Sequence, residues 1–291
     1  MPHIYDCQVN VVKRLLEPIR SYLENFGINL SLNSKTTGLT PRKDVIELLN
    51  RLRPQDNGHN LIRIGGLGDG GYLLPDDLSG IGELFSPGSN QLSNFEKDIA
   101  DRWKIKSFIC DSIEEKPTDL SPFQDFTPSW VGPYSDGEKF ISLEDWVREK
   151  SQASGDLLLQ MDIEGAEFQT LISTPLETLN RFRIIVIEIH FLEALKNRWA
   201  FELVYAPFFN KILQQFDVIH LHPNNCCGLW NYGEFQYPRI IELTLHRKDR
   251  SRHLRPLATS KHELDYPCVN TNPEISMIFS NSNFNPTIEL E

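Results

Sequence analysis

The stretch Gly155-Asp-Leu-Leu-Leu-Gln-Met-Asp-Ile-Glu-Gly-Ala-Glu167 decides the fold of this chain. Its apolar run, Leu157 to Met161, has almost no polar alternation, which is typical of a parallel strand covered on both faces. The run ends in two acids and a glycine, Asp162, Glu164 and Gly165. Ligands of open parallel α/β sheets bind beyond the carboxyl ends of the strands, so these carboxylates stand where such a fold performs chemistry. The stretch therefore indicates an enzyme.

The composition argues against a nucleic-acid-binding or membrane protein. Of 291 residues, 40% are hydrophobic and 24% charged, enough for one large core with an appendage. The net charge is -11, and no basic face that could replace phosphate counterions is evident. The five cysteines include no CxxC spacing, which argues against a structural zinc site and fits a reducing cytosol. Without a recognisable signal peptide or membrane span, we expect a cytoplasmic protein.

Strand and helix patterns alternate from about residue 59 onward. We expect an N-terminal helical appendage over residues 1–58, a main domain over 59–250 and a C-terminal tail over 251–291, which is rich in Pro, Asn and Ser. The alternation predicts a doubly wound α/β sheet. Two late strand patterns, Val218–Leu221 and Ile240–Leu245, enclose a turn-rich segment and indicate an antiparallel hairpin at the sheet edge.

Two candidate ligand-binding residues follow the first strands of this sheet. Gly88 in Ser86-Pro-Gly-Ser89 precedes a predicted helix, so a ligand could approach the backbone there, although a plain turn would look the same. Asp111 follows the strand pattern Ile105–Cys110, about 20 residues after Gly88, as does the acid that accepts ribose hydroxyls in dinucleotide folds. The alternative for Asp111 is a surface helix cap.

Histidines and acids end two later strand patterns. Glu188 and His190 close the buried pattern Phe182–His190 and point to one face because they lie two residues apart. Polar groups in such a place need a partner or a ligand, and histidine is the usual base near neutral pH. His220 and His222 repeat the arrangement on another strand. A structural histidine would give the same pattern, so both interpretations stay open.

Glu167 and the glycine-rich segment 65–71 are weaker indications of function. Glu167 is expected to favour the dipole of the helix that it begins. The glycine-rich segment 65–71 either lets a ligand lie against its backbone or forms a flexible hairpin turn.

Taken together, the motifs resemble the FkbM-like family of S-adenosylmethionine-dependent methyltransferases. The resemblance rests on Met161-Asp-Ile-Glu-Gly-Ala-Glu167, Ile187-Glu-Ile-His190, Gly68-Asp-Gly-Gly-Tyr72 and Asn94-Phe-Glu96, and it spans roughly residues 60–245. It implies a class I methyltransferase fold, which is a Rossmann-like α/β sheet, mostly parallel with an antiparallel last strand. It also implies S-adenosyl-L-methionine as cofactor. The single glycine of Ser86-Pro-Gly-Ser89 departs from the family's usual acid-x-Gly-x-Gly pattern.

The resemblance also assigns roles to single residues. It implies that Ser86 and Gly88 line the methionine end of the cofactor. Asp111, with Ser112 beside it, would bind the ribose. Asp162 would lie beside the transferring methyl group. The residues that would close over the cofactor or the acceptor are Asp69, Gly70 and Gly71.

Methyl transfer from a sulfonium is an in-line displacement, so catalysis consists of positioning the acceptor and removing its proton. We expect His190 or His222 to be the base for a hydroxyl, with Asp162 and Glu188 orienting it. Alternatively, Asp162, Glu188 and a nearby histidine could hold Mg²⁺ or Mn²⁺, which would acidify a sugar hydroxyl.

The resemblance favours a hydroxyl of a sugar or natural product as acceptor. N-methylation of a peptide side chain is an alternative, since residues 1–58 could form a groove for a peptide. These helices could also mediate a homodimer or cap the site. A Rossmann oxidoreductase that uses NAD(P) is a further alternative, but the chain lacks the G-x-G-x-x-G motif.

Overall fold

The computed structural model describes residues 38–88, 94–112, 120–279 and 286–290. The chain divides between Leu39 and Thr40, and the described residues from Thr40 onward form the larger, compact unit. The boundaries expected near residues 58 and 250 both fall inside the larger unit. Most of the expected N-terminal helical appendage, residues 1–37, lies outside the described residues. Among those described, no helix is long and apolar enough to cross a membrane.

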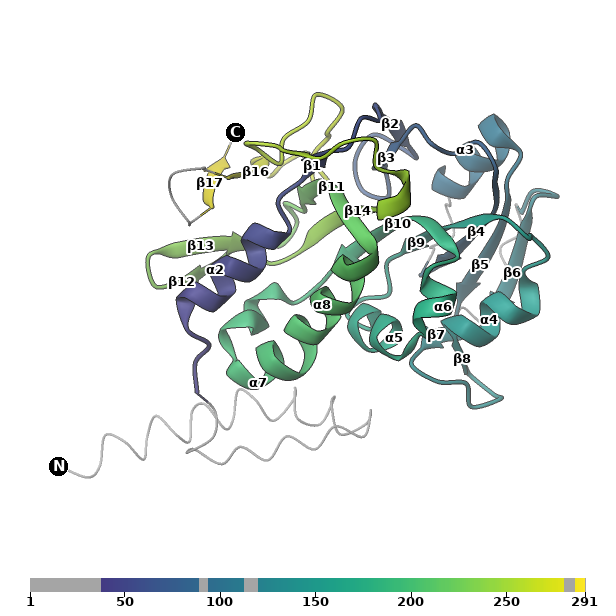
Figure 1. The fold of residues 1–291 in the computed structure, drawn as a ribbon, viewed down its shortest axis with the longest axis horizontal. Coiled ribbons are helices and arrows are strands. Elements are labelled where there is room, and N and C mark those ends of the chain that lie inside the picture. The colour runs from purple at the N-terminus through teal and green to yellow at the C-terminus, as the bar shows by residue number, and fades with distance from the viewer. Residues whose placement is uncertain (1–37, 89–93, 113–119, 280–285, 291) are drawn as a thin grey trace. The chain divides into compact units, whose positions relative to one another are not determined.

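A seven-stranded sheet organises the larger unit (Figure 1). Its order from edge to edge is β11 (Phe216–Pro223), β14 (Ile241–Arg247), β10 (Phe182–Ile189), β9 (Asp156–Met161), β4 (Ile81–Pro87), β5 (Lys106–Asp111) and β6 (Gln124–Pro128). β14 is antiparallel to both of its neighbours, and the other pairs are parallel. The predicted class I methyltransferase fold, mostly parallel with an antiparallel last strand, is confirmed.

The predicted edge hairpin is present, but its connection is not a simple turn. β11 and β14 pair at the edge of the sheet, with β11 outermost. Between them lies a second hairpin of β12 (Leu229–Tyr232) and β13 (Phe235–Pro238). Phe235 and Tyr237 of β13 are buried in the main core, so this segment contributes to packing as well as to chain reversal.

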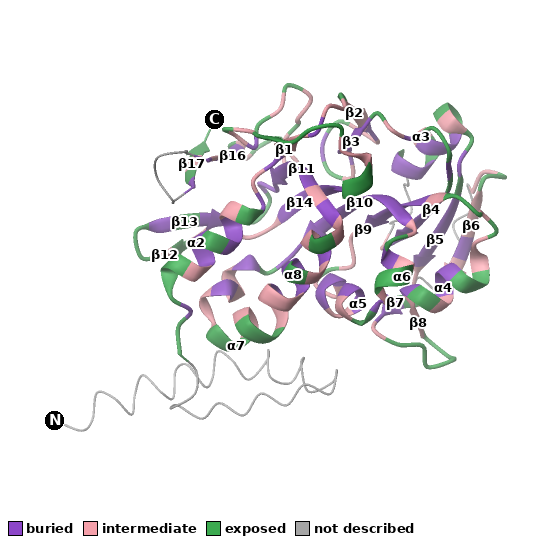
Figure 2. Ribbon diagram, viewed as in Figure 1, coloured by how far each residue is buried: buried purple, intermediate pink, exposed green. Residues whose placement is uncertain are grey.

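Apolar side chains cover both faces of the sheet, as the unbroken run of β9 predicts. Leu157, Leu159 and Met161 join the main core, while Leu158 points to a second core on the other face. Burying each of these side chains stabilises the fold by roughly 1.5–3 kcal/mol. The purple interior of Figure 2 follows the central strands.

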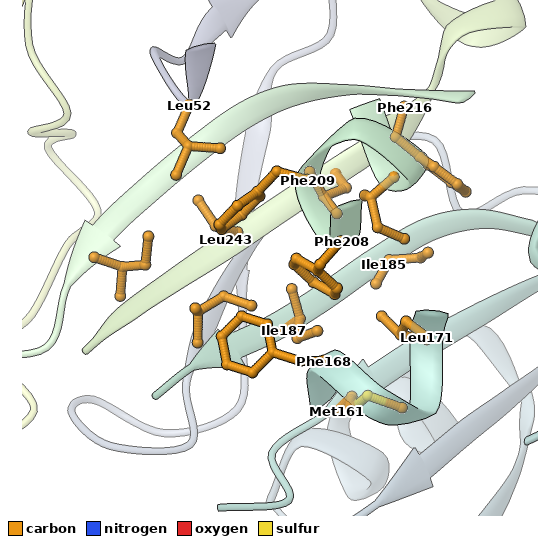
Figure 3. Packing of buried hydrophobic residues seen from close by; sticks show 14 of the residues in the cluster. Leu52, Met161, Phe168, Leu171, Ile185, Ile187, Phe208, Phe209, Phe216 and Leu243 are labelled. Atoms are coloured by element: carbon orange, nitrogen blue, oxygen red, sulfur yellow. The ribbon is translucent and has the colours of Figure 1, made fainter. Parts of the chain in front are cut away.

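Helices cover the face that carries the main core. They are α2 (Arg42–Arg51), α4 (Leu143–Lys150), α5 (Glu167–Ser173), α6 (Leu176–Leu179) and α8 (Ala206–Gln215). Ser142 caps α4 as expected, because its hydroxyl accepts the N–H of Asp145 at 3.1 Å. Phe168 of α5 and Phe208 of α8 meet edge to face at 5.0 Å between ring centroids, beside Ile187 (Figure 3).

The helical segment before β11 is divided. It begins as η1 (Leu192–Lys196) and α7 (Arg198–Ala200), continues as a π-helical turn η2 (Phe201–Tyr205), and becomes α8. Pro207 lies in the first turn of α8 and has no N–H to donate. The π-helical turn η2 directly precedes this proline-containing turn.

The other face is covered by α3 (Asn94–Trp103) and the hairpin of β2 (Leu61–Ile64) and β3 (Tyr72–Pro75). A separate parallel pair, β7 (Trp130–Gly132) and β8 (Phe140–Ser142), follows β6. This second face carries the polar side chains that end the strands, as shown below.

The segment expected as a loose tail is part of the folded unit. After η3 (Lys248–Arg250), β15 (Arg255–Pro256) pairs with β1 (Gln55–Asp56), and β16 (Ile275–Ile278) pairs with β17 (Thr287–Leu290). Met277 and Phe279 lie in the main core. These strands are short and pair with distant residues, so their local pattern resembles an irregular tail.

Candidate functional site

A row of polar side chains crosses the sheet at the carboxyl ends of its parallel strands. Glu188 of β10 is the ladder partner of Glu242 of β14, and Glu242 is the partner of His222 of β11. Asp162 directly follows β9, the neighbour of β10. Glu188, Glu242 and His222 are each 4–5% exposed. The sequence prediction that Asp162, Glu188 and His222 gather at one edge is therefore correct in its placement.

The carboxyl groups of Asp162 and Glu188 lie close together, with one oxygen of each within 4.8 Å of the other. Glu188 also accepts a hydrogen bond of 2.7 Å from Nδ2 of Asn224. Burial raises the pKa of Asp162 to about 6, against the opposing charge of His190. Burial and the charge of Asp162 raise the pKa of Glu188 to about 10. Two acids this close do not both ionise readily, so at neutral pH the pair retains one proton, on Glu188.

His190 is held by a buried acid. Its Nδ1 lies 3.1 Å from Oε1 of Glu167, which is 0% exposed and also accepts the N–H of Ile163 at 3.0 Å. Nε2 of His190 lies 3.5 Å from Oε2 of Glu164 and 3.8 Å from Oδ1 of Asp162. Burial alone would lower the pKa of His190, but the hydrogen bond and charge of Glu167 raise it above its ordinary value.

These contacts change the interpretation of Glu167. The expected role was to favour a helix dipole, whereas the carboxylate turns inward and fixes the imidazole of His190. When one ring nitrogen of a histidine bonds a buried carboxylate, that bond fixes the orientation of the ring and the tautomer. Nε2 of His190 is thereby directed toward Asp162 at the sheet edge.

His222 has both nitrogens engaged. Its Nδ1 lies 3.0 Å from Oε2 of Glu242, and its Nε2 lies 2.7 Å from Oε1 of Glu274. Cys268 Sγ donates to Oε1 of Glu242 at 3.2 Å. Burial alone would lower the pKa of His222, but hydrogen bonds with Cys268, Glu242 and Glu274 raise it far above the ordinary value. His222 is therefore a bound imidazolium here and not a free base.

The turn after β4 requires glycine. Gly88 has a φ of +83°, and a Cβ there would lie 1.6 Å from the carbonyl oxygen of Asp162. Only glycine allows the ends of β4 and β9 to approach this closely. The N–H of Gly88 also donates to the carbonyl of Cys110 at 2.9 Å, which joins the end of β5. Gly88 thus brings three strand ends together at one point.

Ser86 lies below this turn and is 0% exposed. Its hydroxyl contacts the carboxylate of Glu96 on α3 and lies 2.5 Å from Oε1 of Gln160 on β9. Ser86 therefore ties α3 and β9 to β4 in this structure. Asp111 and Ser112 end β5 next to β6, and both are half-buried.

The glycine-rich loop is a folded turn over the polar row. The guanidinium of Arg63 donates to the carbonyls of Gly66 at 2.9 Å and Gly68 at 3.0 Å. A Cβ on Gly71 would lie 2.0 Å from the carbonyl of Gly66, so the two arms of the loop touch. The loop is thus held in shape by its own contacts rather than left as a flexible hairpin turn.

Asp69 at the tip of this loop faces the acids of the row, although its side chain is exposed. Partial burial and the charges of Glu242 and Glu164 raise its pKa. Tyr72, just after the loop, is 4% exposed, and burial with the charge of Glu242 raises its pKa well above the ordinary value. Asp69 and Tyr72 therefore lie within electrostatic reach of Glu242, and closure of Asp69, Gly70 and Gly71 over a cofactor or acceptor stays a prediction.

Several site residues have little or no signal in the sequence. Glu242 is an acid inside the apolar pattern Ile240–Leu245, and that interruption could have identified it. Cys268 and Glu274 belong to the segment interpreted as a tail, and no local periodicity points to them. Neither their burial nor their proximity to His222 is encoded in nearby residues.

Comparison with known proteins shows a family likeness in the central segment. Residues 140–224 match the family model described as the methyltransferase FkbM domain. The predicted family resemblance is confirmed. The FkbM match contains four residues expected to be catalytic, Asp162, Glu188, His190 and His222.

One solved structure gives a weaker likeness. It is described as M. capricolum TrmK in complex with the natural cofactor product S-adenosyl-homocysteine, with 11% identity and a TM-score of 0.31. The match covers 64% of this chain and 69% of that chain. Among curated proteins, none matches this chain.

Proposed function

We propose that the protein transfers a methyl group from S-adenosyl-L-methionine to a hydroxyl of a sugar or natural product, with His190 as the base. The observation that carries this proposal is the arrangement of His190, whose Nδ1 is held by buried Glu167 and whose Nε2 points to Asp162 at the sheet edge. This arrangement lies within the segment that matches the methyltransferase FkbM domain.

The ends of β4, β5 and β9 fit the cofactor. Gly88 lets the ends of β4 and β9 meet, because a side chain there would collide with the carbonyl of Asp162. Oδ1 of Asp162 is buried and has no hydrogen-bond partner among the described residues, so it could accept from an ammonium or hydroxyl group. Asp111 at the end of β5 would accept the ribose hydroxyls. When bound, the cofactor would supply the methyl group on a sulfonium.

His190 would accept the proton of the acceptor hydroxyl on Nε2. The carboxylate of Glu167 would stabilise the imidazolium that forms, since it bonds Nδ1. Asp162 would orient the hydroxyl, and protonated Glu188 would hold Asp162 in place. We favour His190 over His222 as the base because both nitrogens of His222 are already engaged by carboxylates. General-base catalysis of this kind contributes roughly 10²–10⁴-fold.

N-methylation is a second candidate because acids surround the site. Burial and the charges of Glu242 and Glu164 raise the pKa of Asp69. Such a negative surface favours a cationic acceptor, for example the amine of a peptide side chain. A dinucleotide oxidoreductase receives no support, since β14 is antiparallel and the chain lacks the G-x-G-x-x-G motif.

Mg²⁺ or Mn²⁺ at Asp162, Glu188 and His190 is a variant of the same proposal. One ligand atom from each of these residues lies within 4.8 Å of the other two. The ion would replace the proton that the acid pair now shares and would acidify a hydroxyl acceptor. Methyl transfer that survives exhaustive EDTA treatment would eliminate this variant.

The test is a screen of sugar, natural-product and peptide acceptors, with formation of S-adenosylhomocysteine as the readout. His190→Gln should lower kcat roughly 10²–10⁴-fold and leave S-adenosylhomocysteine binding intact. His253→Gln is the matched control, because His253 is an exposed histidine with a 55% exposed side chain. Wild-type activity in His190→Gln would overturn the assignment of the base.

A further inference from the structure

Three side chains of metal-ligating type converge at the β11 end of the polar row. A ligand atom from each of His222, Glu242 and Cys268 lies within 4.8 Å of the others. His222 and Glu242 come from neighbouring strands, β11 and β14, whereas Cys268 comes from the segment before β16. The convergence is therefore a product of the tertiary fold and not of a local turn.

The orientation of His222 matches that of a metal ligand. Its Nε2 lies 2.7 Å from the carboxylate of Glu274, while its Nδ1 faces Glu242. In protein metal sites, a ligating histidine usually donates its second nitrogen to a carboxylate, which fixes the ring and the tautomer. Oε2 of Glu274 is buried and has no hydrogen-bond partner among the described residues. Glu274 thus stands where an outer carboxylate would.

The charge of this cluster also calls for a cation. Two carboxylates, Glu242 and Glu274, and the thiol of Cys268 surround the single imidazole of His222. Glu242 and His222 are 4% and 5% exposed. Even with His222 protonated, the group carries a net negative charge, and burying such a charge without compensation is costly. A divalent cation would provide the compensation.

We propose that His222 Nδ1, Glu242 and Cys268 bind a divalent transition-metal ion of the zinc class, with Glu274 orienting His222. Sulfur, nitrogen and oxygen ligands together suit zinc, whereas Mg²⁺ and Ca²⁺ prefer oxygen alone. Binding would release the Cys268 thiol proton and the Nδ1 proton of His222 to solvent. Three protein ligands leave one position for water or another ligand. The proposal does not depend on methyl transfer.

Such an ion would fasten the C-terminal segment to the sheet. Cys268 and Glu274 belong to that segment, which also approaches the sheet where Oδ1 of Asp265 lies 3.0 Å from Nε2 of His220. Asn225, after β11, donates to the carbonyl of Val269 at 3.1 Å. The absence of a CxxC spacing argued against zinc in the sequence, but that argument covers only sites with closely spaced ligands. Ligands from two strands and a distant segment fall outside it.

The test uses the full-length, tag-free protein after dialysis against a chelator. Zinc is added back and counted by mass spectrometry, and Co²⁺ is added to a second sample for absorption spectroscopy. We expect about one ion per chain and a thiolate-to-cobalt charge-transfer band. Cys268→Ser should remove the band, whereas the matched control Cys227→Ser should keep it. Glu274→Gln should keep the band and weaken binding roughly 10–100-fold.

Two results would overturn the proposal. One is the absence of zinc and cobalt binding by the wild-type protein. This result does not depend on whether any variant folds. The other is a charge-transfer band that persists in Cys268→Ser with native circular dichroism. Metal content and spectra are measured without substrate or cofactor. A negative result here therefore leaves the methyltransferase proposal standing, and failure of methyl transfer leaves the metal-site proposal standing.

Discussion

Glu188→Gln should make the protein more stable at neutral and alkaline pH. Gln has nearly the same shape as protonated Glu188, so it can still donate to Asp162 and accept from Nδ2 of Asn224, now 2.7 Å from Glu188. It differs from Glu188 only in having no proton to lose. The substitution therefore isolates how the buried carboxyl group of Glu188, next to that of Asp162, changes the free energy of unfolding.

The magnitude follows from the raised pKa of Glu188, which is about 10 in the folded protein against 4.5 for the free side chain. Between these values the folded protein holds one proton that the unfolded chain has released. The free energy of unfolding therefore falls as pH rises, by about 1.4 kcal/mol per pH unit. Between pH 6 and pH 8, wild type should lose about 3 kcal/mol more than Glu188→Gln.

The assay is urea unfolding of both proteins at pH 6, 7 and 8, followed by circular dichroism. Other titrating groups, including Asp162 and His190, are present in both proteins, so the difference between the two pH slopes reports Glu188. Glu234→Gln, on the exposed turn between β12 and β13, is the control and should keep the wild-type slope. Equal pH slopes in wild type and Glu188→Gln would refute the shared-proton description.

Three further predictions concern the base, the turn and the core. Glu167→Gln removes the charge that raises the pKa of His190, so the rise of activity with pH should move to lower pH; an unmoved profile of initial rates would contradict it. Gly88→Ala places a Cβ 1.6 Å from the carbonyl oxygen of Asp162, and denaturation should show a loss of more than about 2 kcal/mol. Phe208→Ala, at a side chain 1% exposed, should lose about 3–5 kcal/mol in the same assay without changing the pH profile.

The central sheet could be predicted because its signals are local. The run Leu157–Met161 is apolar on both faces, so it indicates a covered parallel strand whatever its neighbours are, and β9 is Asp156–Met161. The acids and histidines that end β9 and β10 could be placed at one edge, because parallel strands have their carboxyl ends at the same edge. Asp162, Glu188 and His190 were found in this way.

The rest of the site depends on contacts that local patterns do not report. Glu167 is the first residue of helix α5. An acid at that position is compatible both with a favourable contact to the helix dipole and with a side chain that turns inward to bond His190, so the sequence does not distinguish the two. Cys268 and Glu274 reach His222 from a segment without periodicity, and Glu274 lies 2.7 Å from a residue 52 positions earlier in the chain. The division of the helical segment before β11, where η2 directly precedes the turn that contains Pro207, is not encoded in the apolar spacing.

The most direct test of the central claim is calorimetry with S-adenosylhomocysteine. We expect one binding site for S-adenosylhomocysteine, formed by the ends of β4, β5 and β9. Asp111→Ala should weaken binding at least about tenfold, or about 1.4 kcal/mol, whereas Asp101→Ala on the exposed side of α3 should bind like wild type. Absence of binding by the wild-type protein, or binding of NADH in its place, would contradict the claim that this chain uses S-adenosyl-L-methionine.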